Sequence, residues 1–188
     1  MRKVALITDG WRRLFTYAWP AGILQRIRET GEDVNLYIFN STGNWSRDAG
    51  YNRAEYNIYN LPELSDFDGI ILELNNISSP AVLADVISNA KRSGRPVVSI
   101  ANELGDFYYV GIDNYSAMKQ VIAHLHEVHD CKKFWLLVGA QDNYESSCRL
   151  QGMLDYAKEH KIKIDKDDIW YGSFDYIYGT GTRSSRML

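Results

Sequence analysis

The chain has 188 residues, with 21 Lys and Arg against 24 Asp and Glu, two cysteines and 13% aromatic residues. This length suits one domain or two small lobes, and it buries enough surface to need no disulfide or metal staple. The formal charge of −3 disfavours a dedicated nucleic-acid binder, and no apolar run approaches the roughly 20 residues of a membrane span. Because Cys131 and Cys148 cannot build a disulfide framework, and the N-terminal apolar run is too short for a secretion signal, we expect a cytoplasmic protein.

Short apolar runs alternate with amphipathic stretches over the first hundred residues. Strands are predicted at 4–8, 34–39, 68–74 and 96–100. Helices are predicted from Trp19 to near Gly31, at 47–57, and at 81–93 after the capping pair Ser79-Pro80. This alternation is typical of βαβ units and of a mainly parallel, doubly wound α/β sheet.

The pattern restarts after a boundary near residues 101–109. Strands are predicted at 109–112, 134–138 and 169–174, and helices at 113–128 and 145–158. We therefore expect two Rossmann-like lobes, an N-terminal one over 1–104 and a C-terminal one over 105–188. The second lobe has too few predicted strands to close, so we expect it to be incomplete.

The loops that follow the predicted strands share one chemistry. They combine carboxylates, carboxamides and arginines with aromatic rings, and their members are Asp9 to Arg13, Asn40 to Trp45, Asn75-Asn76, Asn102-Glu103, Gln141 to Asn143 and Phe174-Asp175. Ligands of doubly wound folds bind at the carboxyl ends of the strands, and such side chains suit a polyhydroxylated or planar small molecule. The same residue types also satisfy turns and helix caps, so both interpretations stay open.

Four aromatic residues follow the first strand within nine positions: Trp11, Phe15, Tyr17 and Trp19. In a loop they would form a stacking wall over a ligand pocket. The alternative is a hydrophobic staple that packs this loop against the sheet.

The sequence contains no recognisable catalytic or metal motif. It lacks G-x-S-x-G, a G-K-[ST] phosphate loop and a G-x-G-x-x-G turn after the first strand, so we expect no cofactor and no enzyme. His124, His126 and His129 would point to different sides of one continuous helix, and polar residues at a helix C-terminus explain them better than a metal site. The rival from the enzyme class is a small doubly wound hydrolase or transferase that uses Asp9 and Glu73.

The order of motifs resembles a known family. Residues 4–8, 34–40, 67–72 and 95–100 (VALIT, VNLYIFN, FDGIIL and RPVVSI) resemble the first lobe of type I periplasmic-binding-protein-like domains. Residues 110–114 (VGIDN), 134–139 (FWLLVG) and 146–152 (SSCRLQG) resemble the effector domain of lactose- and purine-repressor (LacI-type) regulators. The strongest piece is the segment from Arg149 to Gly152.

The resemblance implies a sensor of a sugar-like or nucleobase-like effector, with two lobes that close on the ligand and control an output module. Position by position, it implies that Arg149 binds the effector, that Phe174 stacks on its ring, and that Asp142 and Asn143 supply polar contacts. The first-lobe contacts would come from Trp11, Tyr17, Asn75 and Glu103, with Asp106 as an alternative to Glu103. A homodimer is expected, without a membrane and without nucleic acid bound by this segment itself.

Two departures from the family leave the output open. No helix-turn-helix headpiece precedes the first strand, and the chain ends before the remaining strands of the second lobe, so we expect a fragment of a longer regulator. Asp9 to Trp19, Tyr37 to Asn40 and Asn44 to Ser46 also resemble sensor domains that precede a diguanylate cyclase (GGDEF) module. A further alternative is an interaction module whose exposed aromatic residues bind a protein partner.

Overall fold

The structure is a computed structural model that describes residues 1–9, 14–42, 48–75, 77, 79–141 and 143–172. The chain divides into two compact units, Met1–Gly111 and Ile112–Leu188. Each unit is described by itself.

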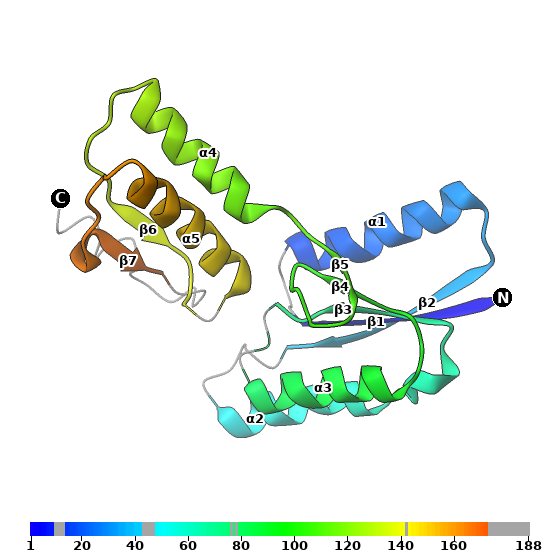
Figure 1. Cartoon of the computed structure of the whole chain (residues 1–188). Coiled ribbons are helices and arrows are strands. Elements are labelled where there is room, and N and C mark those ends of the chain that lie inside the picture. Colours follow the sequence, from blue (N-terminus) through cyan, green and yellow to red (C-terminus); the bar gives the residue numbers. More distant parts are fainter. Residues whose placement is uncertain (10–13, 43–47, 76, 78, 142, 173–188) are drawn as a thin grey trace. The chain divides into compact units, whose positions relative to one another are not determined.

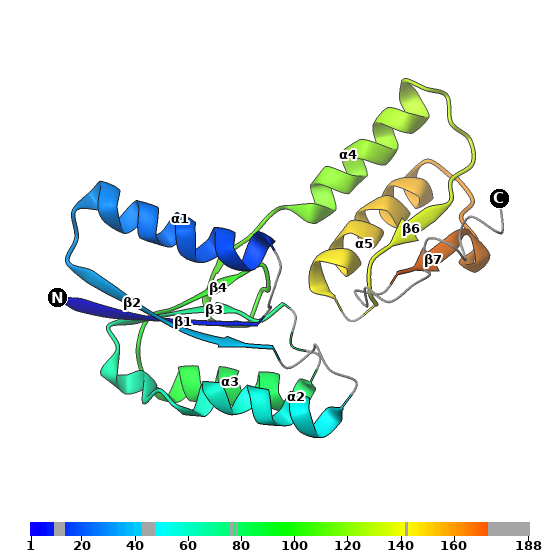
Figure 2. The ribbon, with the colours of Figure 1, turned by 180° about the vertical axis from the view of Figure 1, so that it is seen from behind.

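The first unit is a five-stranded parallel sheet with helices on both faces, as Figures 1 and 2 show. The strands lie in the order β2-β1-β3-β4-β5, and every pairing is parallel, so the predicted parallel α/β architecture is confirmed. The elements are β1 (Arg2–Asp9), α1 (Leu14–Thr30), β2 (Val34–Ser41), α2 (Ala49–Glu55), the 3-10 helices η1 (Tyr56–Asn60) and η2 (Leu64–Asp66), β3 (Gly69–Glu73), α3 (Pro80–Arg92), β4 (Val97–Ile100) and β5 (Tyr108–Val110).

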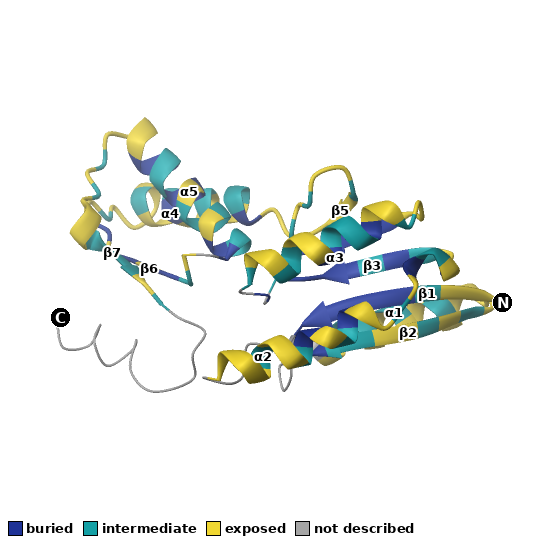
Figure 3. Cartoon of the chain, turned by 90° about the horizontal axis from the view of Figure 1, so that it is seen from below, coloured by how far each residue is buried: buried dark blue, intermediate teal, exposed yellow. Residues whose placement is uncertain are grey.

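One face of this sheet carries the main hydrophobic core. Alternate residues of the central strands, such as Ala5, Ile7 and Leu72, pack against residues of η1 and α3, such as Tyr59 and Val86. Figure 3 shows β1 and β3 among the buried parts of the chain. The opposite face is covered by α1 (Figures 1 and 2), and none of the helix residues whose side chains are described, 17–30, belongs to this core cluster.

Helix α1 begins earlier than the sequence predicts. The sequence predicts a helix start at Trp19-Pro20, from the spacing of Ile23 and Ile27 with polar residues between them. In the structure Pro20 lies inside the helix, where it removes one i→i−4 hydrogen bond, and neighbours with high helix propensity such as Ala18 and Ala21 continue the helix around it. Tyr17 lies in this helix, so the expectation that it belongs to a loop is wrong.

The second unit packs two helices on a two-stranded parallel sheet. Its elements are α4 (Asn114–Glu127), β6 (Leu136–Val138), α5 (Tyr144–Glu159), the 3-10 helix η3 (Lys166–Asp168) and β7 (Ile169–Tyr171). Ile122, Met153 and Tyr156 of the helices form the core with Leu136 and Val138 of the sheet. The part of the chain that the structure describes includes no helix long and apolar enough to cross a membrane.

Candidate functional site

The carboxyl edge of the first sheet brings together the ends of strands that are far apart in the sequence. Strand order reverses between β1 and β3, so a crevice is expected outside the carboxyl ends of these two strands. The last residues of β1, β2 and β3 are Asp9, Ser41 and Glu73. In the register, Asp9 pairs with Ser41, and Thr8 pairs with Glu73.

A buried polar network lies at this edge. The Thr8 hydroxyl donates a 2.8 Å hydrogen bond to Glu73 Oε2, and the Tyr59 hydroxyl donates one of 3.0 Å to the Thr8 carbonyl. Asp9, Thr8, Tyr59 and Glu73 are all buried. Burying polar groups is costly unless they are hydrogen-bonded, so these two bonds fix the orientation of Thr8, Tyr59 and Glu73.

Tyr59 keeps its proton throughout the neutral range. Burial raises the pKa of the Tyr59 phenol, and the carboxylate of Asp9 raises it further. The phenol therefore remains a hydrogen-bond donor at this edge of the sheet. Because these hydrogen bonds are buried, they hold the ends of β1 and β3 together and form a rigid floor under the loops that follow the strands.

Three of the predicted first-lobe residues lie in the described segments that follow strands of this sheet. Asn75 is half-buried and follows β3 directly, and Glu103 is exposed in the loop after β4. Tyr17, in the first turns of α1, has 64% of its surface exposed. Ala101 opens the loop after β4 with a φ of 65°, a left-handed conformation that costs a non-glycine residue free energy.

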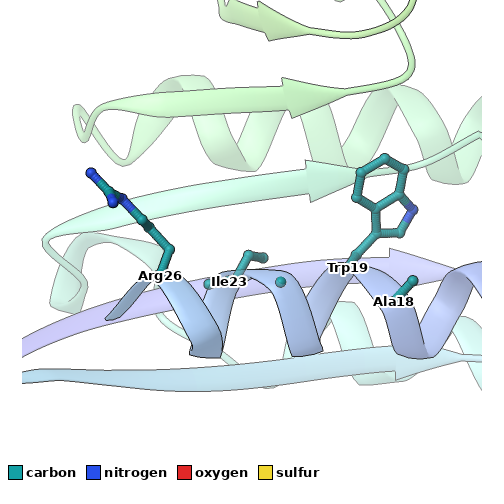
Figure 4. A pocket seen from close by; sticks show the side chains of 5 residues that line it. Ala18, Trp19, Ile23 and Arg26 are labelled. Atoms are coloured by element: carbon teal, nitrogen blue, oxygen red, sulfur yellow. The ribbon is translucent and has the colours of Figure 1, made fainter. Parts of the chain in front are cut away.

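An apolar hollow of about 440 Å³ lies along α1 and is lined by Ala18, Trp19, Gly22, Ile23 and Arg26. Figure 4 shows the side chains of Trp19, Ile23 and Arg26 projecting from one side of the helix. Of the predicted site residues that the structure describes, none lines this hollow.

In the second unit, side chains cap the N-termini of both helices. Asp113 caps α4 by accepting a 2.9 Å hydrogen bond from the Ser116 amide, and Asn143 caps α5 by accepting one of 2.8 Å from the Ser146 amide. Asn143 is buried, with only 6% of its surface exposed. Its observed contact is thus the capping role that the sequence left open as an alternative to ligand binding.

Arg149 reaches from α5 to the first residue of α4. Its Nε donates a 2.8 Å hydrogen bond to Asn114 Oδ1, and its Nη2 lies 3.7 Å from Glu145 Oε2. Asn114 in turn donates to Glu145 Oε1 and to the Ile112 carbonyl, each at 3.3 Å. The guanidinium is therefore held in place by a carboxamide and a carboxylate before any ligand arrives.

The same guanidinium keeps donor capacity for a ligand. A guanidinium carries five N–H donors, and among the described residues its hydrogen bonds and ion pair involve Nε and Nη2. The side chain is 43% exposed. A planar, pre-oriented fork of this kind suits paired hydroxyls or a carboxylate.

The glycine of the Arg149-to-Gly152 motif allows α5 to pack closely against α4. A Cβ at this position would lie 2.3 Å from the Tyr115 carbonyl oxygen and 3.3 Å from the Lys119 amide nitrogen of α4. Glycine is thus required for the close approach of the two helices.

Three of the predicted site residues, Trp11, Asp142 and Phe174, lie outside the described residues. The sequence reasoning missed Thr8, Tyr59 and Asn114. Thr8 had a usable signal, since it is a polar residue near the end of an apolar run, whereas the partners of Tyr59 and Asn114 come from distant parts of the chain. The described residues hold no group of three or more His, Cys, Asp or Glu side chains arranged to bind a metal ion together.

Solved structures share this fold over nearly the whole chain. The transcription regulator CcpA of Lactococcus lactis matches 94% of this chain with a TM-score of 0.66 and 21% identity, over 60% of its own length. The glucose-galactose binding protein GanP of Geobacillus stearothermophilus matches 94%, with a TM-score of 0.65 and 19% identity, over 59% of its length. A periplasmic binding protein/LacI transcriptional regulator from Alkaliphilus metalliredigens, complexed with D-xylulofuranose, matches 95% with a TM-score of 0.62 and 17% identity, over 59% of its length.

The fold is that of LacI-type effector domains. The TM-scores show that the chain shares the fold of these regulators and binding proteins, and it spans about 60% of the length of each of the three structures. No family model matches the sequence, and no curated protein matches it.

Proposed function

We propose that this chain is the effector-sensing part of a LacI-type transcriptional regulator. It binds a small carbohydrate-like or nucleobase-like molecule at the carboxyl edge of its parallel sheet and is not an enzyme. Binding favours closure of the two lobes, and this population shift is passed to an output module.

The observation that carries this proposal is the switch point between β1 and β3, where a buried polar network supports the crevice expected in doubly wound folds. A rigid floor with exposed polar residues around it suits a ligand rich in hydroxyl groups. Structures of the same fold are titled as a glucose-galactose binding protein and as a complex with D-xylulofuranose.

The second lobe contributes Arg149 to the proposed site. Its hydrogen bond to Asn114 and its ion pair with Glu145 reduce the entropy that the side chain loses on meeting a ligand. Asn143, Asp142 and Phe174 remain proposed ligand contacts beside it, as do Trp11, Tyr17, Asn75 and Glu103 from the first lobe.

The output is proposed to be transcriptional, and the protein cytoplasmic and homodimeric. Structures of the same fold are named as transcription regulators, which favours this output over a diguanylate cyclase. Analytical ultracentrifugation of the chain, with and without effector, tests the dimer: a sedimentation coefficient that fits 21.6 kDa at every concentration would refute it.

Thermal unfolding in the presence of a panel of monosaccharides, nucleobases and nucleosides tests the sensor function. A ligand present at 100 times its Kd stabilises the folded state by about 2.7 kcal/mol, which is a measurable rise in Tm. We expect Arg149→Ala to abolish the rise while the matched variant Arg28→Ala, exposed on α1, retains it. A panel without any shift would count against the sensor function, and an unchanged shift in Arg149→Ala would remove Arg149 from the site.

A further inference from the structure

All four histidines of the chain gather where α4 and α5 end in the second unit. His126 Nδ1 lies 3.0 Å from the Tyr156 hydroxyl, and His160 stacks on the Tyr156 ring with 4.1 Å between the ring centroids. His124 and His129 form a separate, exposed pair on the surface. The two groups differ because the first is held by a buried tyrosine and the second is open to solvent.

The His124–His129 pair forms where the chain turns back after the end of α4. The helix ends at Glu127, and Asp130 adopts a left-handed φ of 54°. The Cys131 amide then donates a 3.0 Å hydrogen bond to the Leu125 carbonyl, which closes a turn over the last helical residues. The assumption of a continuous helix, which sent the histidines to different sides, therefore does not hold for His129.

The turn brings two imidazole nitrogens face to face. His129 Nε2 lies 3.1 Å from His124 Nε2, and the ring centroids are 4.8 Å apart at an interplanar angle of 78°. Two nitrogens bound to one divalent metal at about 2.1 Å are about 3.0 Å apart at a right angle and about 3.4 Å apart at the tetrahedral angle. The observed separation falls within this range.

We propose that His124 and His129 chelate a late first-row divalent cation, Ni²⁺, Cu²⁺ or Zn²⁺, in adjacent coordination positions. Imidazole is a preferred ligand of these ions. The neighbouring carboxylates are already engaged: Asp130 pairs with Lys132, and Glu127 accepts a 2.9 Å hydrogen bond from Tyr156. Two protein ligands thus leave the remaining positions to water, which makes this an exchangeable surface site, separate from the proposed effector site.

Calorimetric titration of the full chain with NiCl₂, without a polyhistidine tag, tests the proposal. We expect saturable binding of one ion per chain, and a loss of affinity of about tenfold or more in His124→Gln and in His129→Gln. The matched control His160→Gln should bind as the unchanged protein does, because His160 stacks on Tyr156 instead of joining the pair. Cys131→Ser should also bind normally and so exclude the nearby thiol.

Paramagnetic broadening gives a readout that does not depend on affinity. Substoichiometric Ni²⁺ should broaden the imidazole C–H resonances of His124 and His129 before those of His126 and His160. The proposal is overturned by the absence of saturable binding, by full affinity in the double variant His124→Gln/His129→Gln, or by an equal loss in His160→Gln. Both ligand residues are exposed, so far-UV circular dichroism should show each variant folded.

Discussion

The hydroxyl of Thr8 donates to the carboxylate of Glu73 across the two strands where the sheet reverses its order. The two residues are paired in register on β1 and β3, and they are 2% and 5% exposed. Since the crevice of a doubly wound fold opens at this point, the hydrogen bond secures the strands that would support the ligand.

Thr8→Val keeps the shape of the side chain and removes the hydroxyl. We expect a loss of about 1–3 kcal/mol in the free energy of unfolding, because a buried carboxylate loses a donor. The matched control is Thr42→Val, whose hydroxyl also donates to a glutamate, Glu55, but in a half-buried position. Urea unfolding of both variants measures the difference, and an equal loss would mean that burial adds nothing to the Thr8 contact.

Tyr59→Phe should change the dependence of stability on alkaline pH. The pKa of Tyr59 is raised in the folded protein, so the unfolded chain releases this proton first as pH rises above about 10. The stability contributed by the protonated phenol is complete below that pH and is lost above it. Tyr59→Phe should be about 1 kcal/mol less stable at pH 7, through loss of the bond to the Thr8 carbonyl, yet decline less between pH 9.5 and about 11.

Urea unfolding at pH 7 and at pH 10.5 measures the effect of Tyr59→Phe. The pKa values of Tyr115 and Tyr156 are also raised, the first by its hydrogen bond to Asp155 and the second by burial. Both residues are present in the two proteins compared, so their contributions cancel. Parallel pH profiles would show that Tyr59 titrates alike in the folded and unfolded states.

Gly152→Ala and Gly22→Ala are the same substitution in two helices and should have opposite effects. The new methyl group at 152 would collide with the α4 backbone, so we expect the free energy of unfolding to fall by about 1–3 kcal/mol. At Gly22 nothing lies within 4 Å, and alanine should stabilise α1 by up to about 1 kcal/mol. Urea unfolding, followed by far-UV circular dichroism, measures the free energy of unfolding of both variants. If Gly152→Ala were stabilising, α4 would have to shift away from α5 at no cost.

Ala101→Gly should relieve the left-handed backbone after β4. We expect the free energy of unfolding to rise by about 0.5–1 kcal/mol. This value is the cost of the left-handed conformation for alanine, minus the larger entropy of glycine in the unfolded chain. The reverse substitution nearby, Gly105→Ala, places a side chain at a φ of 57° in open space and should cost about 1 kcal/mol. Thermal unfolding of both variants measures the direction of each change in stability. A lower Tm for Ala101→Gly would contradict the proposed backbone strain at Ala101.

Asn114→Ala should weaken effector binding without a direct contact to the ligand. The variant removes the acceptor of Arg149 Nε, and losing one hydrogen bond to a charged group should lower affinity by about tenfold. The control is Gln151→Ala on α5, whose amide donates to Asp155 on the same helix. Ligand-induced shifts in Tm compare the two, and unchanged affinity in Asn114→Ala would show that Arg149 needs no such support.

The sequence was sufficient wherever a local pattern decides the structure. The apolar runs of β1 and β3 and the cap Ser79 with Pro80 were read correctly, because burial and capping act over a few residues. Two local patterns give the wrong helix bounds: the predicted first helix starts at Trp19 although α1 begins at Leu14, and the predicted helix over 113–128 runs one residue past the end of α4.

The missing parts of the site depend on contacts between distant residues. Arg149 and Asn114 are 35 positions apart, and Tyr59 and Thr8 are 51 apart. No periodicity encodes such pairs, since they follow from how the helices and strands pack. The turn at Asp130 belongs to the same class, because a left-handed aspartate is one of several ways to end a helix.

The three-residue spacing between Arg149 and Gly152 has a mechanical consequence. Residues separated by three positions share one face of a helix, so the side chain that reaches across to α4 and the position that lets α4 approach are on the same side. The distance between the two helices at Gly152 sets the distance that the Arg149 side chain must span to reach Asn114. A larger residue at position 152 is therefore expected to move α4 away and to lengthen the hydrogen bond between Arg149 and Asn114.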